Sequence, residues 1–503
     1  MRKCYFPFGW AVVVAFGLGI WFIVYFLVEW DPSGRPVRLL LTDDAMISMD
    51  YARSWAQGCG WVWYCGADRV EGFTNPLWVA YMAFWHLFPF PPAVAALPIV
   101  LTGFLTLYLQ LRYTYKLAKR YFSEEVGRLA VWLLALLPPA VLWHFMGLET
   151  GFLMALTTYL SYEASMREAP TFPNWIGCAA GILTRMDFLV PLGALCIFWS
   201  LRTRRRYPFL LILGTCIGLL VVLTVVRWSY YGALLPNTYY LKVTSVPLFL
   251  RWANGLLTLG GSLLTNLPLW ALGVYAVIRG WEGQGIYWLA ILVVGAEILY
   301  SVYVGGDAWE MAALTNRYLG LGYPLLGVLA ASVLKRYKLL FQMVGLAFIS
   351  AGVSNRWLHL STLAPYVRPL SKETVSNLFS VFVPFPLPDL GIESGAKVWL
   401  GPAGTTPYFY PQYRYGDYLG KCDSAVAHRS PTCYLTMRFY QLYTPGHTRI
   451  GIDRVLADEE AKVVCIGPRG HPGRVRSACE AERYLPRLEE QFTYRPPYGW
   501  FRR

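Results

Sequence analysis

Runs of about 20 consecutive apolar residues recur along the chain, and a run of that length can cross the hydrocarbon core of a bilayer as a helix. The first covers roughly residues 6–29 and follows Arg2 and Lys3. Hydrophobic residues make up 56% of the chain and charged residues only 15%, with a mean hydropathy of +0.39. One globular core cannot hide so much apolar surface, because soluble domains carry about 25% charged residues. The sequence therefore predicts a mostly α-helical, polytopic membrane protein.

Short basic clusters indicate the direction of each crossing, because loops rich in Lys and Arg stay in the cytoplasm. The clusters are residues 116–120, residues 202–206, Arg279 and residues 335–338. No small-residue cleavage pattern follows the first apolar run, so we interpret it as an uncleaved span with a cytoplasmic N-terminus. If the chain crosses the membrane so that each basic cluster lies in the cytoplasm, it forms about 11 transmembrane helices, with two short ones near Arg185. The C-terminus is then external.

The same charge distribution excludes one class of partner. A net charge of +14 would suggest nucleic-acid binding in a soluble protein. Here the basic residues cluster in the loops between spans, so no nucleic acid is expected. The sequence also contains no P-loop, dinucleotide-binding fingerprint, internal repeat or zinc-finger spacing.

The character of the chain changes near residue 355. Residues 356–503 hold no apolar run of membrane length and are rich in Pro, Gly, Tyr and charged residues. Short β-type runs at residues 397–400 and 461–466 are bounded by turn residues, and helical patterns cover residues 453–461 and 477–491. We expect residues 1–355 to form the transmembrane domain and residues 356–503 an external, soluble α/β domain.

Six of the ten cysteines fall in regions expected outside the cytoplasm, where disulfides persist. They group by sequence proximity into the pairs Cys59 with Cys65, Cys422 with Cys433, and Cys465 with Cys479. The alternative is that these are unpaired, buried thiols.

An adjacent pair of carboxylates, Asp43 and Asp44, follows the first span on the external side. Like charges this close raise each other's pKa, which is typical of sites that use the charge. Either residue could act as a general base, bind a substrate hydroxyl or ligate a divalent cation such as Mg²⁺, Mn²⁺ or Ca²⁺. The alternative is that one of them caps the helix expected over residues 45–56.

Polar and aromatic residues near this pair are candidates for contact with a sugar or an acceptor. Arg53 lies near the end of the same expected helix, and Arg69, Glu71, Asn75 and Trp78 follow a turn rich in Gly and Trp. The carboxylate of Glu71 either binds sugar hydroxyls or forms an ion pair with Arg69. Trp78 and its neighbours Trp61 and Trp63 are either sugar platforms or membrane-interface anchors.

Further charged residues lie at other external span ends, where ionisable groups are costly and usually face a cavity. Lys242, Arg185 and Arg317, in that order, are our candidates for binding a lipid-linked phosphate, because cations hold phosphate as a charge clamp. Glu149 and Asp307 are candidates for contact with sugar or acceptor. The alternatives are an ion pair of Arg185 with Asp187, and snorkelling of the basic side chains towards the membrane surface.

The segments around these residues resemble a known family. Residues 43–48, 51–53, 58–60 and 69–78 are similar to the first external loop of bacterial GT-C glycosyltransferases like the terminal β-arabinofuranosyltransferase of mycobacterial cell walls. Residues 147–150, 183–185, 235–242 and 305–307 resemble later blocks of that family in order, and residues 397–408 resemble a recurring segment of its tail. Met46 and Met49 stand where the family has aromatic residues.

The resemblance implies a multi-pass enzyme of the bacterial inner membrane with a periplasmic C-terminal domain and an active site that faces the periplasm. Its donor would be a polyprenyl-phosphate sugar, with a pentose such as arabinofuranose favoured, and its acceptor a periplasmic glycan or glycoprotein. One of Asp43 and Asp44 would be the base of a single, inverting displacement. Trp399, Tyr408 and Tyr410 are candidate acceptor contacts in the external domain. The rival interpretation is a lipid-linked sugar flippase or transporter without transferase chemistry.

Overall fold

The structure is a computed structural model, which describes residues 7–31, 33–244, 246–280, 285–311, 316–337, 384–431, 441–465, 490–495 and 499–502. The chain divides into two compact units. One, the helical unit, comprises Met1–Tyr25, Ile99–Leu223 and Gly255–Tyr366. The other, the mixed unit, comprises Phe26–Pro98, Thr224–Asn254 and Val367–Arg503.

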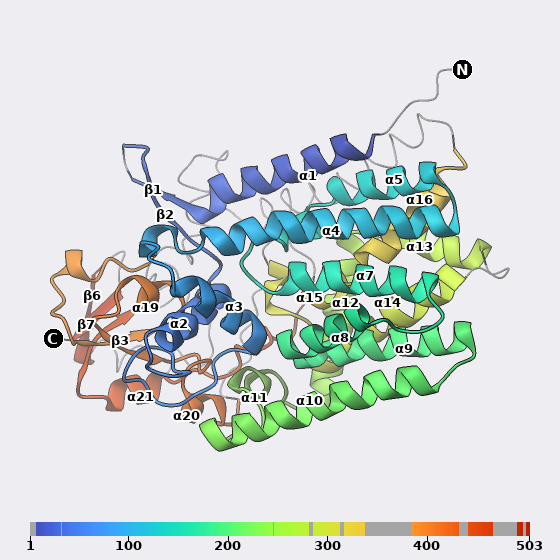
Figure 1. Ribbon diagram of the computed structural model, residues 1–503. Helices are drawn as coiled ribbons and strands as arrows, with labels where there is room; N and C mark the ends of the chain where they lie inside the picture. Colours follow the sequence, from blue (N-terminus) through green and yellow to red (C-terminus); the bar gives the residue numbers. More distant parts are fainter. Residues whose placement is uncertain are drawn as a thin grey trace. The chain divides into compact units, whose positions relative to one another are not determined.

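Helices of different lengths make up most of the described part of the helical unit (Figure 1). In chain order they are α1 (Phe8–Phe22), α4 (Leu97–Tyr121), α5 (Glu124–Ala135), α6 (Pro138–Leu142), α7 (Thr150–Met166), α8 (Phe172–Thr184), α9 (Leu189–Thr203), α10 (Tyr207–Tyr231), α12 (Leu248–Thr265), α13 (Leu267–Arg279), α14 (Gly285–Val304), α15 (Arg317–Gly320) and α16 (Tyr323–Leu334). Helix α14 packs on α9, and α16 packs on both α5 and α13. Gly255 lets α12 approach α14 closely, because a Cβ there would lie 2.5 Å from the carbonyl oxygen of Val302.

Five segments of the described chain are long and apolar enough to cross a membrane: Phe8–Leu27, Pro92–Tyr121, Met186–Thr203, Tyr207–Tyr231 and Gly285–Val304. A sixth arises if α12 and α13, which meet at an angle of 94°, form one broken span. The chain is thus a multi-pass membrane protein, but the 11 expected crossings are not all seen. Several apolar helices are short, such as α8 with 13 residues, and the crossing expected after Lys338 lies outside the described residues.

The mixed unit combines α-helices with two sheets (Figure 1). An antiparallel ribbon of β1 (Val28–Trp30) and β2 (Pro36–Leu39) precedes α2 (Asp43–Ala56) and α3 (Pro76–His86), which pack together. The second sheet has the order β4-β3-β5-β7-β6. Its strands are β3 (Lys397–Leu400), β4 (Arg414–Asp417), β5 (Ala461–Cys465), β6 (Phe492–Arg495) and β7 (Gly499–Arg502).

The central strands of this sheet agree with the sequence expectation. Strands β3 and β5 lie where the β-type runs predicted them, and both are almost entirely buried, as their apolar residues require. Strand β3 pairs in parallel with β4 and β5, whereas β7 is antiparallel to β5 and β6. The helix expected over residues 453–461 is shorter, α21 (Ile452–Ala457). The helix expected over residues 477–491 falls almost wholly outside the described residues.

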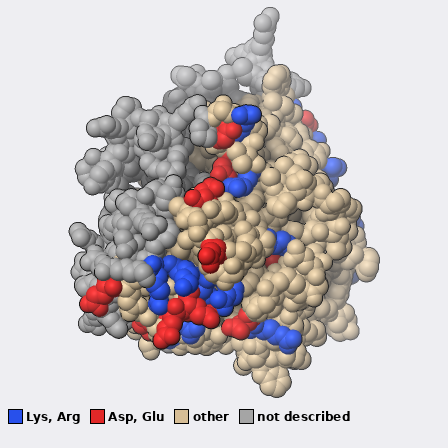
Figure 2. Space-filling model, turned by 90° about the vertical axis from the view of Figure 1, so that its left-hand side faces the viewer, with Lys and Arg blue, Asp and Glu red and all other residues tan. Residues whose placement is uncertain are grey.

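Some charged side chains of this unit lie on its surface. Exposed ion pairs join Arg414 to Glu460 and Arg429 to Asp453. Among the described residues of one face, Figure 2 shows acidic and basic side chains gathered side by side next to uncharged residues. Such exposed pairs contribute little to stability, because solvent screens them.

The cysteines bear out only part of the expected pairing. Cys59 and Cys65 form a disulfide in the loop between α2 and α3. Cys422 and Cys465 instead carry free, buried thiols, so their expected bonds are absent. Their assigned partners, Cys433 and Cys479, lie outside the described residues. Cys422 follows a tight loop next to Gly72, and Cys465 ends a largely buried strand, so burial explains these thiols better than cross-linking.

Glu71 forms a buried ion pair with Arg227, near the end of α10 (Tyr207–Tyr231). The guanidinium also donates from Nη2 to Oε1 of Glu71 at 3.2 Å, so the contact is bidentate. The expected alternative partner, Arg69, lies instead over the ring of Tyr230, 4.8 Å from its centroid. Glu71 therefore has a structural partner that sequence spacing did not indicate.

We expect Glu71→Gln to lower the free energy of unfolding by about 3 kcal/mol, because it leaves the buried guanidinium of Arg227 without its counter-charge. A fluorescence-monitored thermal melt of the purified protein measures the effect. The matched control is Glu460→Gln, which breaks the exposed pair with Arg414 and should change stability by less than about 0.5 kcal/mol. Equal melting temperatures for the two variants would contradict the structural role of Glu71.

Candidate active site

Both aspartates of the external pair lie in the first turn of α2. The N-cap residue is Thr42, and no side-chain hydrogen bond caps the helix. Neither Asp43 nor Asp44 therefore fills the capping role that the sequence left open. The positive end of the helix dipole still favours two negative charges in this turn.

The carboxylate of Asp43 forms hydrogen bonds with the backbone of the C-terminal segment. Its two oxygens accept hydrogen bonds from the backbone N–H groups of Ala403, at 3.2 Å, and Gly404, at 2.9 Å. Only 7% of the residue is exposed. Burial, opposed by the charge of Lys421, raises the pKa of Asp43 to about 6. We interpret Asp43 as the residue that fixes the start of α2.

Gly404 makes this contact possible. A Cβ on Gly404 would lie 2.1 Å from the carbonyl oxygen of Asp43 and 2.7 Å from the backbone nitrogen of Ile47. Backbone atoms cannot move aside cheaply, so only glycine fits here. Helix α19 (Thr405–Phe409) begins at the next residue.

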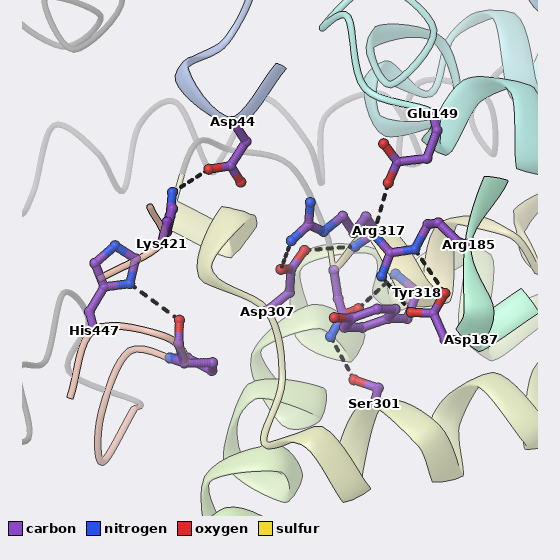
Figure 3. A network of polar contacts seen from close by, with 12 residues as sticks. Asp44, Glu149, Arg185, Asp187, Ser301, Asp307, Arg317, Tyr318, Lys421 and His447 are labelled. Carbon is purple, nitrogen blue, oxygen red and sulfur yellow. Dashed lines mark hydrogen bonds and ion pairs between the residues drawn. The ribbon is translucent and has the colours of Figure 1, made fainter. Parts of the chain in front are cut away.

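Asp44 faces a different partner, because successive side chains on a helix point about 100° apart. Its Oδ1 atom forms an ion pair with the ammonium of Lys421 (Figure 3). About a quarter of the Asp44 side chain is exposed, 26%, against 20% for that of Lys421. Burial lowers the pKa of Lys421, but the charges of Asp44 and Asp43 outweigh it and raise that pKa overall.

The backbone around Lys421 is held by two side chains. Asp417 accepts hydrogen bonds from the backbone N–H groups of Leu419, at 2.8 Å, and of Cys422, also at 2.8 Å. Asn237, at the start of α11 (Asn237–Val243), donates from Nδ2 to the carbonyl oxygen of Lys421 at 3.3 Å. The tight loop therefore presents the ammonium to Asp44 from a fixed backbone.

Lys242, the first phosphate candidate, lies in the same neighbourhood. A Cβ on Gly446 would meet its side chain at 3.7 Å, so Lys242 runs alongside the segment that carries His447. Arg449, fully buried, donates to the carbonyl oxygens of Leu241, at 2.9 Å, and Thr244, at 2.5 Å, and so ties the end of α11 to that segment.

His447 is an uncharged imidazole at neutral pH. Burial, together with the positive charges of Lys421 and Lys242, lowers its pKa to about 4. Its Nδ1 atom lies 3.2 Å from the carbonyl oxygen of Pro445 (Figure 3). A carbonyl oxygen only accepts hydrogen bonds, so Nδ1 carries the hydrogen and Nε2 the lone pair. The site thus combines a carboxylate, two ammonium groups and a neutral imidazole.

The helical unit holds a second cluster of predicted residues. Arg185 donates to Glu149 at 2.8 Å and to Asp187 at 2.8 Å, and Arg317 pairs with Asp307 at 3.0 Å (Figure 3). Both guanidinium groups are therefore neutralised by carboxylates. The ion pair of Arg185 with Asp187, left open by the sequence, is present. A cavity in this unit is lined by Thr150, Leu153, Arg185, Asp187, Phe188, Glu297, Tyr300, Arg317, Tyr318 and Leu321.

Other candidates make structural contacts within the mixed unit. Arg53 donates to the carbonyl oxygens of Pro407, at 3.2 Å, and Tyr408, and lies over the Tyr408 ring. Asn75 accepts from Ser48 at 3.2 Å and joins α3 to α2. Trp78 is buried against Tyr81.

The three aromatic acceptor candidates of the C-terminal segment differ in exposure. Trp399 and Tyr408 are each only 2% exposed, so they line the interior. Tyr410 is partly exposed and accepts from Arg38 at 3.4 Å.

No group of three or more His, Cys, Asp or Glu side chains is placed to hold a metal ion among the described residues. The oxygens of Asp43 are occupied by backbone donors, and Asp44 faces an ammonium. Asp43 and Asp44 as ligands of a divalent cation thus stay a prediction.

We expect Gly404→Ala to destabilise the protein by about 2 kcal/mol, because the added methyl group overlaps the backbone of α2. Thermal melts of the purified variant measure this. Gly193→Ala is the control, since nothing lies within 4 Å of a Cβ at Gly193. An unchanged melting temperature for Gly404→Ala would rule out the close approach.

The pKa of His447 predicts a pH dependence of stability. Between about pH 6.5 and about pH 4 the unfolded imidazole binds a proton that the folded one does not, so the folded state loses up to about 3 kcal/mol as the pH falls through this window. His447→Asn lacks this loss. The melting temperature of the wild-type protein should therefore fall relative to that of His447→Asn as the pH drops through this window; parallel curves would contradict a buried, neutral His447.

Comparison with known proteins gives no match to any model of a protein family or to any curated protein. Solved structures do match. ArnT from Cupriavidus metallidurans in the apo state is 13% identical over 98% of this chain and 97% of its own, with a TM-score of 0.53. ArnT from the same organism bound to undecaprenyl phosphate is 15% identical over 74% and 69%, with a TM-score of 0.50. The oligosaccharyltransferase of Archaeoglobus fulgidus tethered with an acceptor peptide containing the NVT sequon is 11% identical over 99% and 73%, with a TM-score of 0.50.

These similarities establish the architecture. The match to apo ArnT covers nearly the whole of both chains, including the described C-terminal α/β region. The expected GT-C-like fold is confirmed, whereas nothing in the matches points specifically to an arabinofuranosyltransferase. The chain is a mostly helical, multi-pass membrane protein with a GT-C-like fold and a small C-terminal α/β region.

Proposed function

We propose that the protein is a membrane glycosyltransferase that moves a sugar from a polyprenyl-phosphate donor to a glycan or glycoprotein acceptor outside the cytoplasm. One observation carries the proposal: a partly exposed carboxylate, Asp44, lies with Lys421 at the start of α2 in a chain of GT-C-like fold. The similar structures include one bound to undecaprenyl phosphate and one with an acceptor peptide, which supports this donor and this kind of acceptor.

Asp44 is the base in this mechanism. It accepts the proton of the acceptor hydroxyl while that oxygen attacks the anomeric carbon of the donor. The bond from the anomeric carbon to the phosphate oxygen breaks through an oxocarbenium-like transition state, and the polyprenyl phosphate leaves with the electron pair. Asp43 serves the reaction indirectly, because its backbone contacts fix the turn that carries Asp44.

Lys242 is the first partner for the leaving phosphate, since an ammonium stabilises the charge that develops there. We rank Arg185 and Arg317 after Lys242, because Lys242 belongs to the same compact unit as Asp44 and they do not. The resemblance of the first external loop favours a pentose such as arabinofuranose. The disulfide of Cys59 with Cys65 supports a periplasmic side for this loop, with the N-terminus in the cytoplasm.

The test is transfer of labelled sugar from a polyprenyl-phosphate pentose in membranes that contain the protein. We expect Asp44→Asn to lower the rate by about a hundredfold or more without lowering the melting temperature, because an amide cannot take the hydroxyl proton. Asp43→Asn should lower the melting temperature as well, because it replaces one acceptor oxygen by a donor. Glu460→Gln, on the exposed surface, is the control. Full activity of Asp44→Asn would refute the base assignment, and movement of the lipid-linked sugar across the membrane without transfer would favour a flippase.

A further inference from the structure

We propose that Lys421 is an exchangeable counter-ion, bonded to Asp44 in the free protein and transferred to the donor phosphate when the polyprenyl-phosphate sugar binds. Donor binding would thereby release Asp44 to act as the base. The inference rests on the proposed function and adds to it a residue and an order of events.

The geometry of Lys421 suits an exchange of partners. Its ammonium has three N–H donors, and the only hydrogen-bond acceptor that the described residues offer it is Oδ1 of Asp44 (Figure 3). The ammonium is partly exposed, with 20% of the side chain accessible. Asp417 and Asn237 hold the backbone on both sides of it. The four-carbon side chain can therefore move while the loop stays in place.

The surroundings of Lys421 contain the carboxylates of Asp43, Asp44 and Asp417, a second ammonium and a neutral imidazole. Lys421 is a cation beside Asp44, because burial is outweighed by the charges of Asp44 and Asp43 and its pKa is raised overall. Lys242 brings a second positive charge, which acts on the same imidazole of His447 as Lys421 does. His447 itself is neutral and does not compete for the anion. A phosphate between the two ammonium groups would thus meet two positive charges at once.

The exchange of partners by Lys421 sets the order in which donor binding and acceptor activation occur. While Lys421 holds Oδ1 of Asp44, that oxygen is engaged by an N–H donor. Once Lys421 turns to the phosphate, the oxygen can accept the proton of the acceptor hydroxyl. After transfer, the proton leaves Asp44, the polyprenyl phosphate departs, and Lys421 returns to the carboxylate. The acceptor hydroxyl is therefore activated only when a donor is present.

The test is binding of undecaprenyl phosphate, which carries no sugar, to the purified full chain in lipid nanodiscs. Asp44→Asn removes the competitor of the phosphate for Lys421, so we expect this inactive variant to bind the lipid about tenfold more tightly than the wild-type protein. Lys421→Gln should bind it more weakly, and Asp44→Asn/Lys421→Gln should bind it no better than Lys421→Gln. Lys421→Arg should restore most of the affinity.

Two controls are needed to interpret the binding measurements. Glu460→Gln removes an acidic charge from an exposed pair and should leave the affinity unchanged, which separates an exchange at Lys421 from a general change in charge. Melting temperatures show that each variant is folded. Equal or weaker binding by Asp44→Asn, or a gain that persists without Lys421, would overturn the exchange. The binding assay does not depend on sugar transfer, so it tests the exchange separately from the proposed function. If Asp44→Asn is inactive but binds the lipid no more tightly, only the exchange is wrong. If Asp44→Asn binds more tightly but keeps full activity, the assignment of Asp44 as the base is wrong.

Discussion

The bond between the Asp43 carboxylate and the backbone at Ala403 and Gly404 is the contact on which the candidate site depends. It joins residues that lie 360 and 361 positions apart in the sequence. With Asp43 committed to the backbone, Asp44 is left to face Lys421. Two adjacent, chemically identical side chains therefore take different roles, and the helical turn between them is the cause.

Charge compensation governs the remaining candidates. Several residues that sequence reasoning offered as ligands are paired in the structure: Glu71 with Arg227, Arg185 with Glu149, and Arg317 with Asp307. A buried charge without a partner is costly, so a protein without its ligand satisfies such groups internally. A charged substrate must then displace a partner. This is easiest for a flexible, partly exposed ammonium such as that of Lys421, and hardest for the buried guanidinium of Arg227.

Sequence reasoning succeeded where the physics is local. Apolar runs predicted membrane spans, and β-branched residues between turn signals predicted β3 and β5. The close cysteines 59 and 65 form the disulfide expected of them. Sequence reasoning failed for Cys422 and Cys465, which are free although close partners were assigned to them. It also failed where the partner is distant, because Glu71 pairs with a residue 156 positions away. Lys421 and His447 were missed, because nothing around either residue in the sequence distinguishes it from other surface positions.

The sequence by itself determined that this chain belongs in a membrane, that a carboxylate pair follows its first span, and that an α/β region ends it. These properties depend on the length, polarity and order of neighbouring residues. Only the tertiary structure decided which aspartate is held by the backbone, which faces an ammonium, and which charges are already neutralised. Those outcomes depend on contacts between segments hundreds of residues apart, and such contacts leave no local pattern for sequence reasoning to detect.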